Sequence, residues 1–201
     1  SCALTDGGGV LCWGANDWGQ LGYPAGNGQT PQTVPNLPVA LEVAAGPWCT
    51  CARLADGTVD CWGALEDGCL GTAPATPGSQ PVPTPVPGVT DVVELRLGIP
   101  ESPYCARQAA GGVICWSDKI APKAIPGVDD AVSIAVGYRH VLIRSQSKGL
   151  LVSSATDDGL DWRPATTYVA GTYTAMAAGY GLVLRKGDGT LVEAAFNYDP
   201  Q

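Results

Sequence analysis

Short apolar stretches alternate along the chain with clusters of glycine and proline. Around the turn-forming pair Asp56-Gly57, for example, CARL precedes the turn and TVDC follows it. Two short strand-like stretches that flank an Asp-Gly pair predict a β-hairpin. Connectors such as TPQTVPNLPVALEVAAG run between the hairpins, and each ends in an apolar stretch followed by glycine. The pattern predicts many short strands joined by tight turns, and therefore an all-β protein.

The hairpin pattern recurs at regular intervals, so the chain is an array of one small unit. Three copies carry two cysteines ten residues apart with a tryptophan directly after the second, and two later copies lack the cysteines. In these later copies Leu142 and Val183 take the place of the first cysteine, within one residue, and Ser153 and Glu193 the place of the second. We expect one domain over residues 1–201, with hairpin units near 1–22, 43–71, 95–117, 133–154 and 175–195.

The paired cysteines fall opposite each other across the predicted hairpins. With Asp56 at the centre of the turn, Cys51 lies opposite Cys61, where a cross-strand disulfide is sterically feasible. The same arithmetic pairs Cys2 with Cys12 and Cys105 with Cys115. Cys49 and Cys69 lie outside the pattern, and we expect a fourth disulfide between them. A zinc site of Cys49, Cys51, Cys61 and Cys69 is the alternative, but its spacing is not that of paired zinc knuckles.

The segments CARLADGTVDCWG and ANDWGQLG and the strands ending in VAAG resemble the repeats of RCC1-like (regulator of chromosome condensation) β-propellers. The cysteine-bearing style resembles that of secreted and surface proteins of bacteria. The resemblance covers essentially the whole chain and weakens after Ser117, where the GQLG segment is missing. It implies a disulfide-stapled β-propeller. Family members usually close a ring of about seven blades, whereas this chain has material for about five, which leaves a five-bladed ring and an open or partial seven-bladed ring as alternatives.

Composition narrows the location and the partners. The eight cysteines indicate an oxidising compartment, which favours a secreted or cell-surface protein. The formal net charge of −8 argues against nucleic acid as a partner, and no apolar run is long enough to insert into a membrane. Ser1 stands one residue before a motif cysteine, so we expect a processed, trimmed or partial chain. Its exposed strand edges predict either a seam between the two ends or assembly with another chain.

Aromatic residues supply the candidate binding site. Trp13, Trp62 and Trp116 recur at one position of the unit, which favours packing between blades. Other aromatic residues occupy the loops, where the repeat would gather several of them on one face of the ring as contacts for a protein or glycan. The alternative is that each covers only its own loop. The candidate binding residues are Trp48, Tyr104, Tyr138, Tyr180, Trp18 and Trp162.

Nothing in the sequence nominates a catalytic residue, a metal site or a cofactor. The single histidine, His140, lacks any motif partner for catalysis, and we expect a structural role. None of the acidic residues considered as calcium ligands forms a calcium-binding loop motif, so we interpret most of them as solvated loop and turn charges. These residues are Asp91, Glu94, Asp129, Asp130, Asp157, Asp158 and Asp161. Asp157, Asp158 and Asp161 are the best remaining candidates for calcium ligands. No hydrolase, zinc-protease, Walker or dinucleotide motif is present, and we expect a protein that is not an enzyme.

Three functions remain open from the sequence. The first is a secreted or cell-surface binding and adhesion module that presents loops to a protein or carbohydrate. The second is a structural subunit of an extracellular fibre or surface assembly. The third, implied by the family resemblance alone, is an inhibitor of a secreted enzyme.

Overall fold

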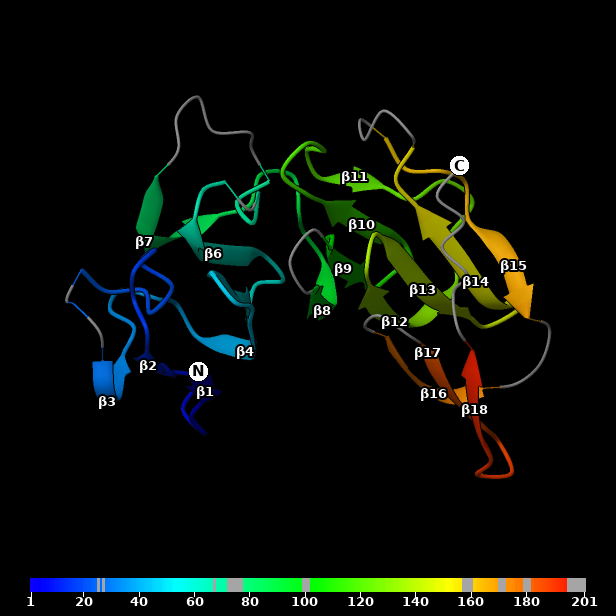
Figure 1. Ribbon diagram of the computed structural model, residues 1–201, viewed down its shortest axis with the longest axis horizontal. Coiled ribbons are helices and arrows are strands. Elements are labelled where there is room, and N and C mark those ends of the chain that lie inside the picture. Colours follow the sequence, from blue (N-terminus) through cyan, green and yellow to red (C-terminus); the bar gives the residue numbers. More distant parts are fainter. Residues whose placement is uncertain are drawn as a thin grey trace.

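The computed structural model describes residues 1–24, 26, 28–66, 68–71, 78–98, 102–156, 161–169, 173–178 and 182–194. These residues form five antiparallel sheets and no helix, which confirms the all-β prediction. No helix long and apolar enough to cross a membrane occurs among them. The sheets follow one another in chain order along an arc, from β1–β3 to β16–β18 (Figure 1).

Each sheet is a simple meander in which strands adjacent in sequence are paired. The first sheet contains β1 (Cys2–Leu4), β2 (Val10–Gly14) and β3 (Gly28–Thr33). The second contains β4 (Ala40–Ala45), β5 (Cys49–Leu54), β6 (Val59–Ala64) and β7 (Ser79–Pro85). The third contains β8 (Val92–Leu97), β9 (Tyr104–Gln108), β10 (Val113–Trp116) and β11 (Lys123–Ala124). The fourth contains β12 (Ala131–Gly137), β13 (His140–Ser145), β14 (Gly149–Ser154) and β15 (Thr166–Val169), and the fifth β16 (Tyr173–Ala178), β17 (Leu182–Lys186) and β18 (Leu191–Ala194).

Successive sheets contact each other through their inner strands. β4 lies against β8, β8 against β12, and β12 against β16, so these four strands line the concave side of the arc. The outer strands β3, β7, β11 and β15 lie at its periphery (Figure 1). In the part of the chain that the structure describes, no strand of the first sheet pairs with a strand of the fifth. Within the described residues the five sheets form an open arc, with the first and fifth sheets at its two ends (Figure 1).

The observed register of the hairpins agrees with the one predicted by counting residues outward from the centre of each turn. Cys2 pairs with Cys12, Cys51 with Cys61, and Cys105 with Cys115. All three pairs are disulfides, and a fourth joins Cys49 to Cys69. The four cysteines of the alternative zinc site are all paired in these disulfides, which favours the disulfide interpretation. Of the cysteine-free hairpins, the fifth sheet pairs Val183 with Glu193 as predicted, whereas in the fourth Ser153 pairs with Val141, one residue from Leu142.

One apolar cluster fills each interface between neighbouring sheets. Trp62 and Trp116, which follow the second cysteine of their hairpins, are fully buried there. The indole Nε1 of Trp62 donates to Gln20 O at 3.0 Å, and that of Trp116 donates to Cys69 O at 2.9 Å. Each tryptophan thus joins its own sheet to the preceding one. The predicted role in packing between blades is confirmed for both, whereas Trp13 is only half-buried.

The hairpin turns also tie neighbouring sheets together. The carbonyls of Gly8, Gly57 and Gly111 accept hydrogen bonds from the first residue of the next inner strand. Gly111 shows why this position favours glycine: its φ is 90°, and an added Cβ would lie 2.6 Å from Asp129 O. A side chain here would be strained and would push the two sheets apart.

Candidate binding face and the inner-strand cluster

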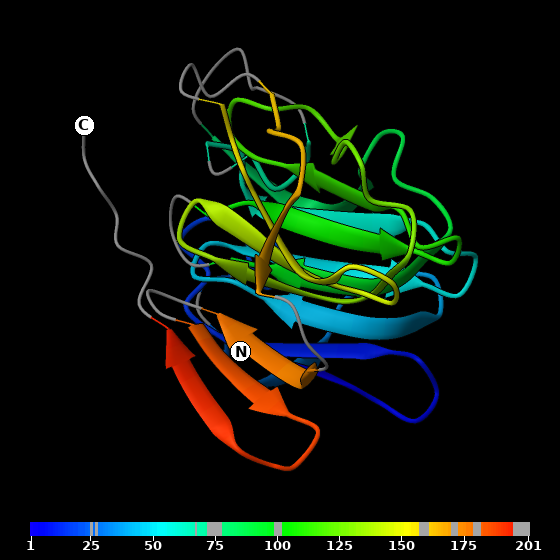
Figure 2. The same ribbon diagram turned by 90° about the vertical axis from the view of Figure 1, so that its right-hand side faces the viewer.

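The loops of the meanders alternate between the two ends of the strands (Figure 2). Short turns such as 55–58 lie at one end, and the connections between β2 and β3, β4 and β5, and β12 and β13 lie at the other. The second group contains Trp18, Trp48 and Tyr138. The topology therefore brings these three aromatic residues, predicted as binding residues, to the same end of the arc. We call this end the aromatic-loop face.

Two of these side chains offer substantial apolar surface to solvent. Trp18 is 37% exposed and Trp48 is 38% exposed, while Tyr138 is half-buried. Tyr104 is buried and stacks on Trp116 with ring centroids 6.1 Å apart. Trp162 is also buried, so neither Tyr104 nor Trp162 presents its ring to a partner in this conformation. Tyr180 lies outside the described residues.

The Trp18 loop is held by polar contacts from within and from the next sheet. Asn16 Oδ1 accepts from Leu21 N at 2.9 Å, and Gln20 Oε1 accepts from Trp18 N at 3.0 Å. Gln20 O then accepts from Thr50 Oγ1 at 2.9 Å, in addition to Trp62 Nε1. These bonds fix the loop against β5 and β6 before any partner arrives.

The Trp48 loop is fixed in a comparable way. Gly46 N donates to Cys49 O at 2.7 Å, and Ala64 N donates to Trp48 O at 2.9 Å. The disulfide from Cys49 to Cys69 follows immediately. An aromatic side chain on a backbone that is already ordered loses little conformational entropy on binding, which favours a contact residue.

Trp162 has a role that the repeat pattern did not reveal. In the fourth sheet Ser154 stands where the first three hairpins carry tryptophan. Trp162, from the segment between β14 and β15, is 4% exposed, and its Nε1 donates to Cys115 O at 3.0 Å. It therefore joins the fourth sheet to the third, as Trp62 and Trp116 join the sheets before it.

The chemistry of the described residues offers little for catalysis. They hold no group of three or more His, Cys, Asp or Glu side chains able to bind a metal ion. His140 Nδ1 lies 2.6 Å from Tyr138 O, and burial lowers the pKa of His140 below its usual value, although that contact opposes the shift. Of the candidate calcium ligands, Asp157 and Asp158 lie outside the described residues, and Asp161 pairs with Lys123 at 2.6 Å.

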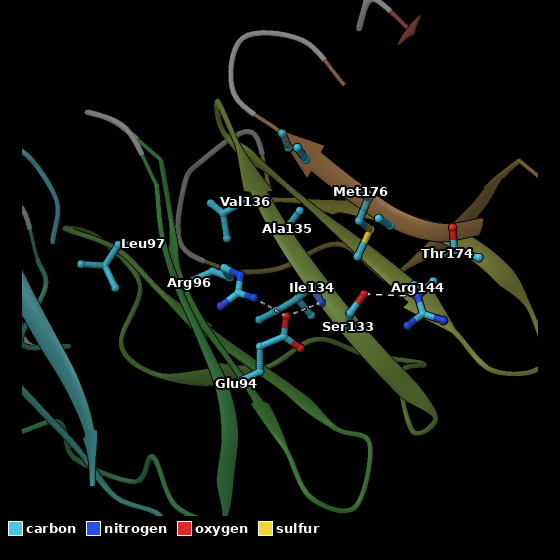
Figure 3. Close-up of a pocket in the computed structure, with 13 residues that line it drawn as sticks. Glu94, Arg96, Leu97, Ser133, Ile134, Ala135, Val136, Arg144, Thr174 and Met176 are labelled. Carbon is cyan, nitrogen blue, oxygen red and sulfur yellow. Dashed lines mark hydrogen bonds and ion pairs between the residues drawn. The ribbon is translucent and has the colours of Figure 1, made fainter. Parts of the chain in front are cut away.

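A cavity of about 460 Å³ lies on the concave side of the arc, between β8, β12 and β16 (Figure 3). Its walls combine apolar residues of β16 with polar and charged side chains of β8, β12 and β13. The latter are Glu94, Arg96, Ser133 and Arg144.

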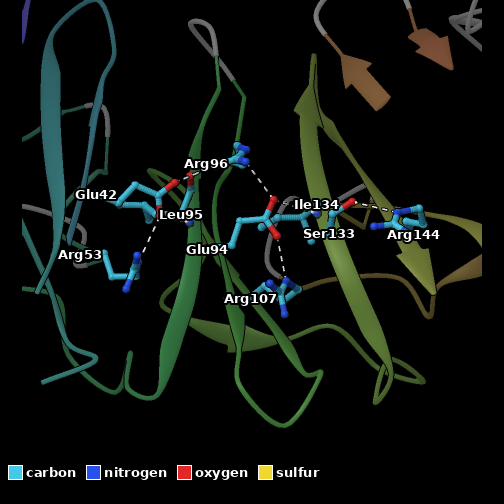
Figure 4. A network of polar contacts seen from close by, with 9 residues as sticks. All are labelled: Glu42, Arg53, Glu94, Leu95, Arg96, Arg107, Ser133, Ile134 and Arg144. Carbon is cyan, nitrogen blue, oxygen red and sulfur yellow. Dashed lines mark hydrogen bonds and ion pairs between the residues drawn. The ribbon is translucent and has the colours of Figure 1, made fainter. Parts of the chain in front are cut away.

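Beside this cavity, glutamate and arginine side chains form a repeated pattern across the sheets (Figure 4). In the second sheet Glu42 of β4 binds Arg53 of β5 at 3.2 Å, and in the third Glu94 of β8 binds Arg107 of β9 at 2.8 Å. Arg96 bridges both glutamates, at 2.8 Å and 3.0 Å. Glu94 is buried, so it is not one of the solvated loop charges that we expect for most of these acidic residues. Sequence alone did not place it on an inner strand opposite an arginine.

Comparison with known proteins agrees with this architecture. A family profile for the Regulator of chromosome condensation (RCC1) repeat matches residues 7–53. No curated protein matches the chain significantly. The solved structures of similar fold include yeast RCC1 (Prp20) bound to Kap60, with a TM-score of 0.76 and 20% identity over 98% of this chain and 54% of that one.

Two further structures give the same picture. Prp20p from Saccharomyces cerevisiae, described with its binding to Gsp1p and histones, has a TM-score of 0.76 and 19% identity over 98% of this chain and 55% of that one. Human WBSCR16 has a TM-score of 0.68 and 22% identity over 89% of this chain and 53% of that one. The chain thus spans about half the length of the structures it matches. It contains an RCC1 repeat and has the fold of RCC1-like β-propellers, as the sequence predicted.

Proposed function

We propose that this chain is an extracellular protein-binding module that contacts its partner through the aromatic-loop face. The observation that carries the proposal is the placement of Trp18 and Trp48, half-exposed on ordered loops at one end of neighbouring sheets. Tryptophan is enriched among the residues that dominate binding energy at protein interfaces. The similar yeast protein binds proteins, which supports the same class of partner here.

The disulfides support the proposed location. Four disulfides, with no free cysteine among the described residues, are consistent with an extracellular protein. Secretion or surface display by a bacterium is the form of this proposal that the cysteine-bearing repeats favour.

Capture of partners from culture supernatant and cell-surface extract tests the proposal. The double variant Trp18→Ala/Trp48→Ala should reduce binding at least roughly tenfold, since loss of one interface tryptophan commonly costs about 2 kcal/mol. Val39→Ala, which removes apolar surface from a 55%-exposed side chain in the β3–β4 loop at the opposite end, is the matched control and should bind normally. Equal binding by the double variant and the wild-type chain would refute the proposal.

A glycan array with the same variants tests the carbohydrate alternative. Tryptophan-dependent binding to a glycan, with no protein captured, would replace the protein partner by a carbohydrate. If the captured protein is a secreted enzyme that loses activity in the complex, the function narrows to inhibition.

A second candidate is assembly with another chain, for which the sheet edges are the specific observation. In the described residues β1 pairs only with β2, and β18 only with β17. Unpaired edges can accept a further strand. This candidate predicts oligomers whose mass rises with concentration in light scattering, and a monomer at every concentration would exclude it.

A further inference from the structure

The cavity between β8, β12 and β16 lies where the glutamate–arginine pattern is broken. The inner strands and their partners repeat one register: Glu42 opposite Arg53, Glu94 opposite Arg107, Ser133 opposite Arg144, and Ala175 opposite Arg185. A register irregularity precedes each of these positions in its inner strand. The arginine is thus present in four sheets, whereas the glutamate is present in only two.

Where the glutamate is present, it fills a defined position between two sheets. Glu42 Oε2 accepts from Arg53 Nε of its own sheet at 3.2 Å and from Leu95 N of the next sheet at 3.0 Å. Glu94 likewise accepts from Arg107 Nε at 2.8 Å and from Ile134 N at 3.3 Å. Each carboxylate therefore accepts from the arginine of its own sheet and from one backbone N–H of the following inner strand, in addition to its ion pair with Arg96.

In the fourth sheet this position lacks a carboxylate. Within the described residues, Arg144 Nε donates to the Ser133 hydroxyl at 3.3 Å and to no carboxylate. Met176 holds the register position of Leu95 and Ile134 in its own strand. Ser133, Arg144 and Met176 all line the cavity (Figure 3). The arginine and the inner-strand residue whose counterparts bind the glutamate in the second and third sheets are thus both present here, on the walls of the cavity.

The charge of the neighbourhood favours an anion in that space. The inner-strand cluster contains two carboxylates, Glu42 and Glu94, and four guanidiniums, Arg53, Arg96, Arg107 and Arg144. It therefore carries an excess of positive charge inside a chain whose formal net charge is −8. Glu94 faces the cavity but is bound by both Arg96 and Arg107, which offset its repulsion of an incoming anion.

We propose that this cavity binds a carboxylate group supplied by a ligand, in the position that Glu42 and Glu94 occupy in the preceding sheets. The carboxylate accepts from the Arg144 guanidinium on one side and from the Met176 N–H on the other. A planar carboxylate fits the guanidinium fork, and such charge-assisted bonds are stronger than neutral ones. The group comes either from a small organic acid or from an acidic side chain of a peptide. This site is separate from the aromatic-loop face.

Titration of the folded protein followed by two-dimensional NMR tests the proposal. The probes are succinate, inorganic phosphate, and an alanine peptide with blocked ends and one central glutamate. We expect succinate or the peptide to shift the Met176 amide and the Arg144 Nε–H signals in a saturable manner. Arg144→Ala should weaken this binding by roughly tenfold or more, as expected for a lost charged hydrogen bond.

Ser133→Glu is the decisive variant, because it restores the residue found in the second and third sheets. It should abolish binding of the probe and raise the melting temperature, since the internal carboxylate then fills the site. Lys119→Ala, which removes one exposed positive charge outside the cluster, is the control for net charge and should bind as the wild type does.

The outcomes separate the two sources of the carboxylate. Tighter binding of the peptide than of succinate assigns the site to an acidic side chain, and the reverse order assigns it to a small acid. Undiminished binding to Ser133→Glu, no saturable shift with either carboxylate, or tighter binding of phosphate than of both would each overturn the proposal.

Discussion

Among individual residues, Asp130 joins the loop before β12 to the turn between β13 and β14. Its carboxylate accepts from Ser145 Oγ at 2.6 Å, from Ser147 Oγ, and from Ser147 N at 2.9 Å. These bonds favour the charged form of the carboxyl. With the Ser145 hydroxyl as the largest cause, they lower the pKa of Asp130 from 3.8 to about 2.

This shift predicts acid sensitivity that can be assigned to one residue. A carboxyl whose pKa is lower in the folded state contributes stability above pH 4 that is lost as the pH falls towards 2. The melting temperature of the wild-type chain should therefore fall more steeply between pH 5 and pH 2 than that of Asp130→Asn, as measured by circular dichroism. Ser145→Ala should reduce the difference, because it removes the largest cause. Parallel curves for the wild type and Asp130→Asn would contradict this assignment.

At the level of elements, the tryptophan that joins neighbouring sheets is not tied to one position of the repeat. Trp62 and Trp116 lie on β6 and β10, whereas Trp162 comes from the segment between β14 and β15. Each is nearly or completely buried and donates to a backbone carbonyl of the preceding sheet. The interaction is thus retained in the fourth sheet although Ser154 has replaced the tryptophan of its hairpin.

Because Trp162 joins two sheets in the same way as Trp62 and Trp116, its truncation should destabilise the folded protein. We expect Trp162→Ala to lower the free energy of unfolding by about 3–5 kcal/mol, and Trp162→Phe to lower it less, since the ring is kept and the Nε1 bond is lost. Urea denaturation measures both. Trp18→Ala, at an exposed tryptophan, is the control and should have a small effect. A loss at Trp162 no larger than that at Trp18 would show that Trp162 is dispensable for stability.

The sequence predicted the hairpins well because their register follows from local turns. Once Asp56 is placed at the centre of its turn, period-two alternation fixes Cys51 opposite Cys61. Cys69 and Gln20 hold equivalent positions in their sheets, since the carbonyls of both accept from the tryptophan of the following sheet.

The glutamate–arginine pairs were not predicted, because their register depends on strand irregularities such as that between Val92 and Glu94. The burial of Trp162 and Tyr104 depends on contacts between sheets, which no local pattern encodes. An arginine at a fixed distance before the hairpin turn in four of the five sheets was the one available signal, and it becomes informative only when the glutamates are aligned with it.

On the scale of the whole molecule, the interfaces between sheets are unequal. The first three share two features: a tryptophan that donates to the preceding sheet, and a turn carbonyl that accepts from the next inner strand. Within the described residues, neither feature joins the fourth sheet to the fifth. That interface rests on an apolar cluster that includes Leu142, Tyr173 and Leu184. In an array whose units contact only their neighbours, the weakest interface governs local opening.

We therefore predict that the fifth sheet opens first. Amide hydrogen exchange followed by mass spectrometry should show faster exchange in β16–β18 than in β4–β6 and β8–β10, under conditions where the whole chain stays folded. Ser133→Glu should slow exchange in β16, because it adds a carboxylate at this interface. Uniform protection across all five sheets would refute the ranking of the interfaces.

The placement of the disulfides has a mechanical consequence. All four lie within single sheets, and the loop closed by Cys51 and Cys61 is nested inside the loop closed by Cys49 and Cys69. Under a force applied along the chain, the sheets can separate one after another without breaking a covalent bond. The bridged segments span 10, 20 and 10 residues and cannot extend while the disulfides are intact. They would therefore shorten the fully stretched chain by roughly 140 Å, at about 3.5 Å per residue. The chain would thus unfold stepwise under force, and the disulfides would limit its maximum extension.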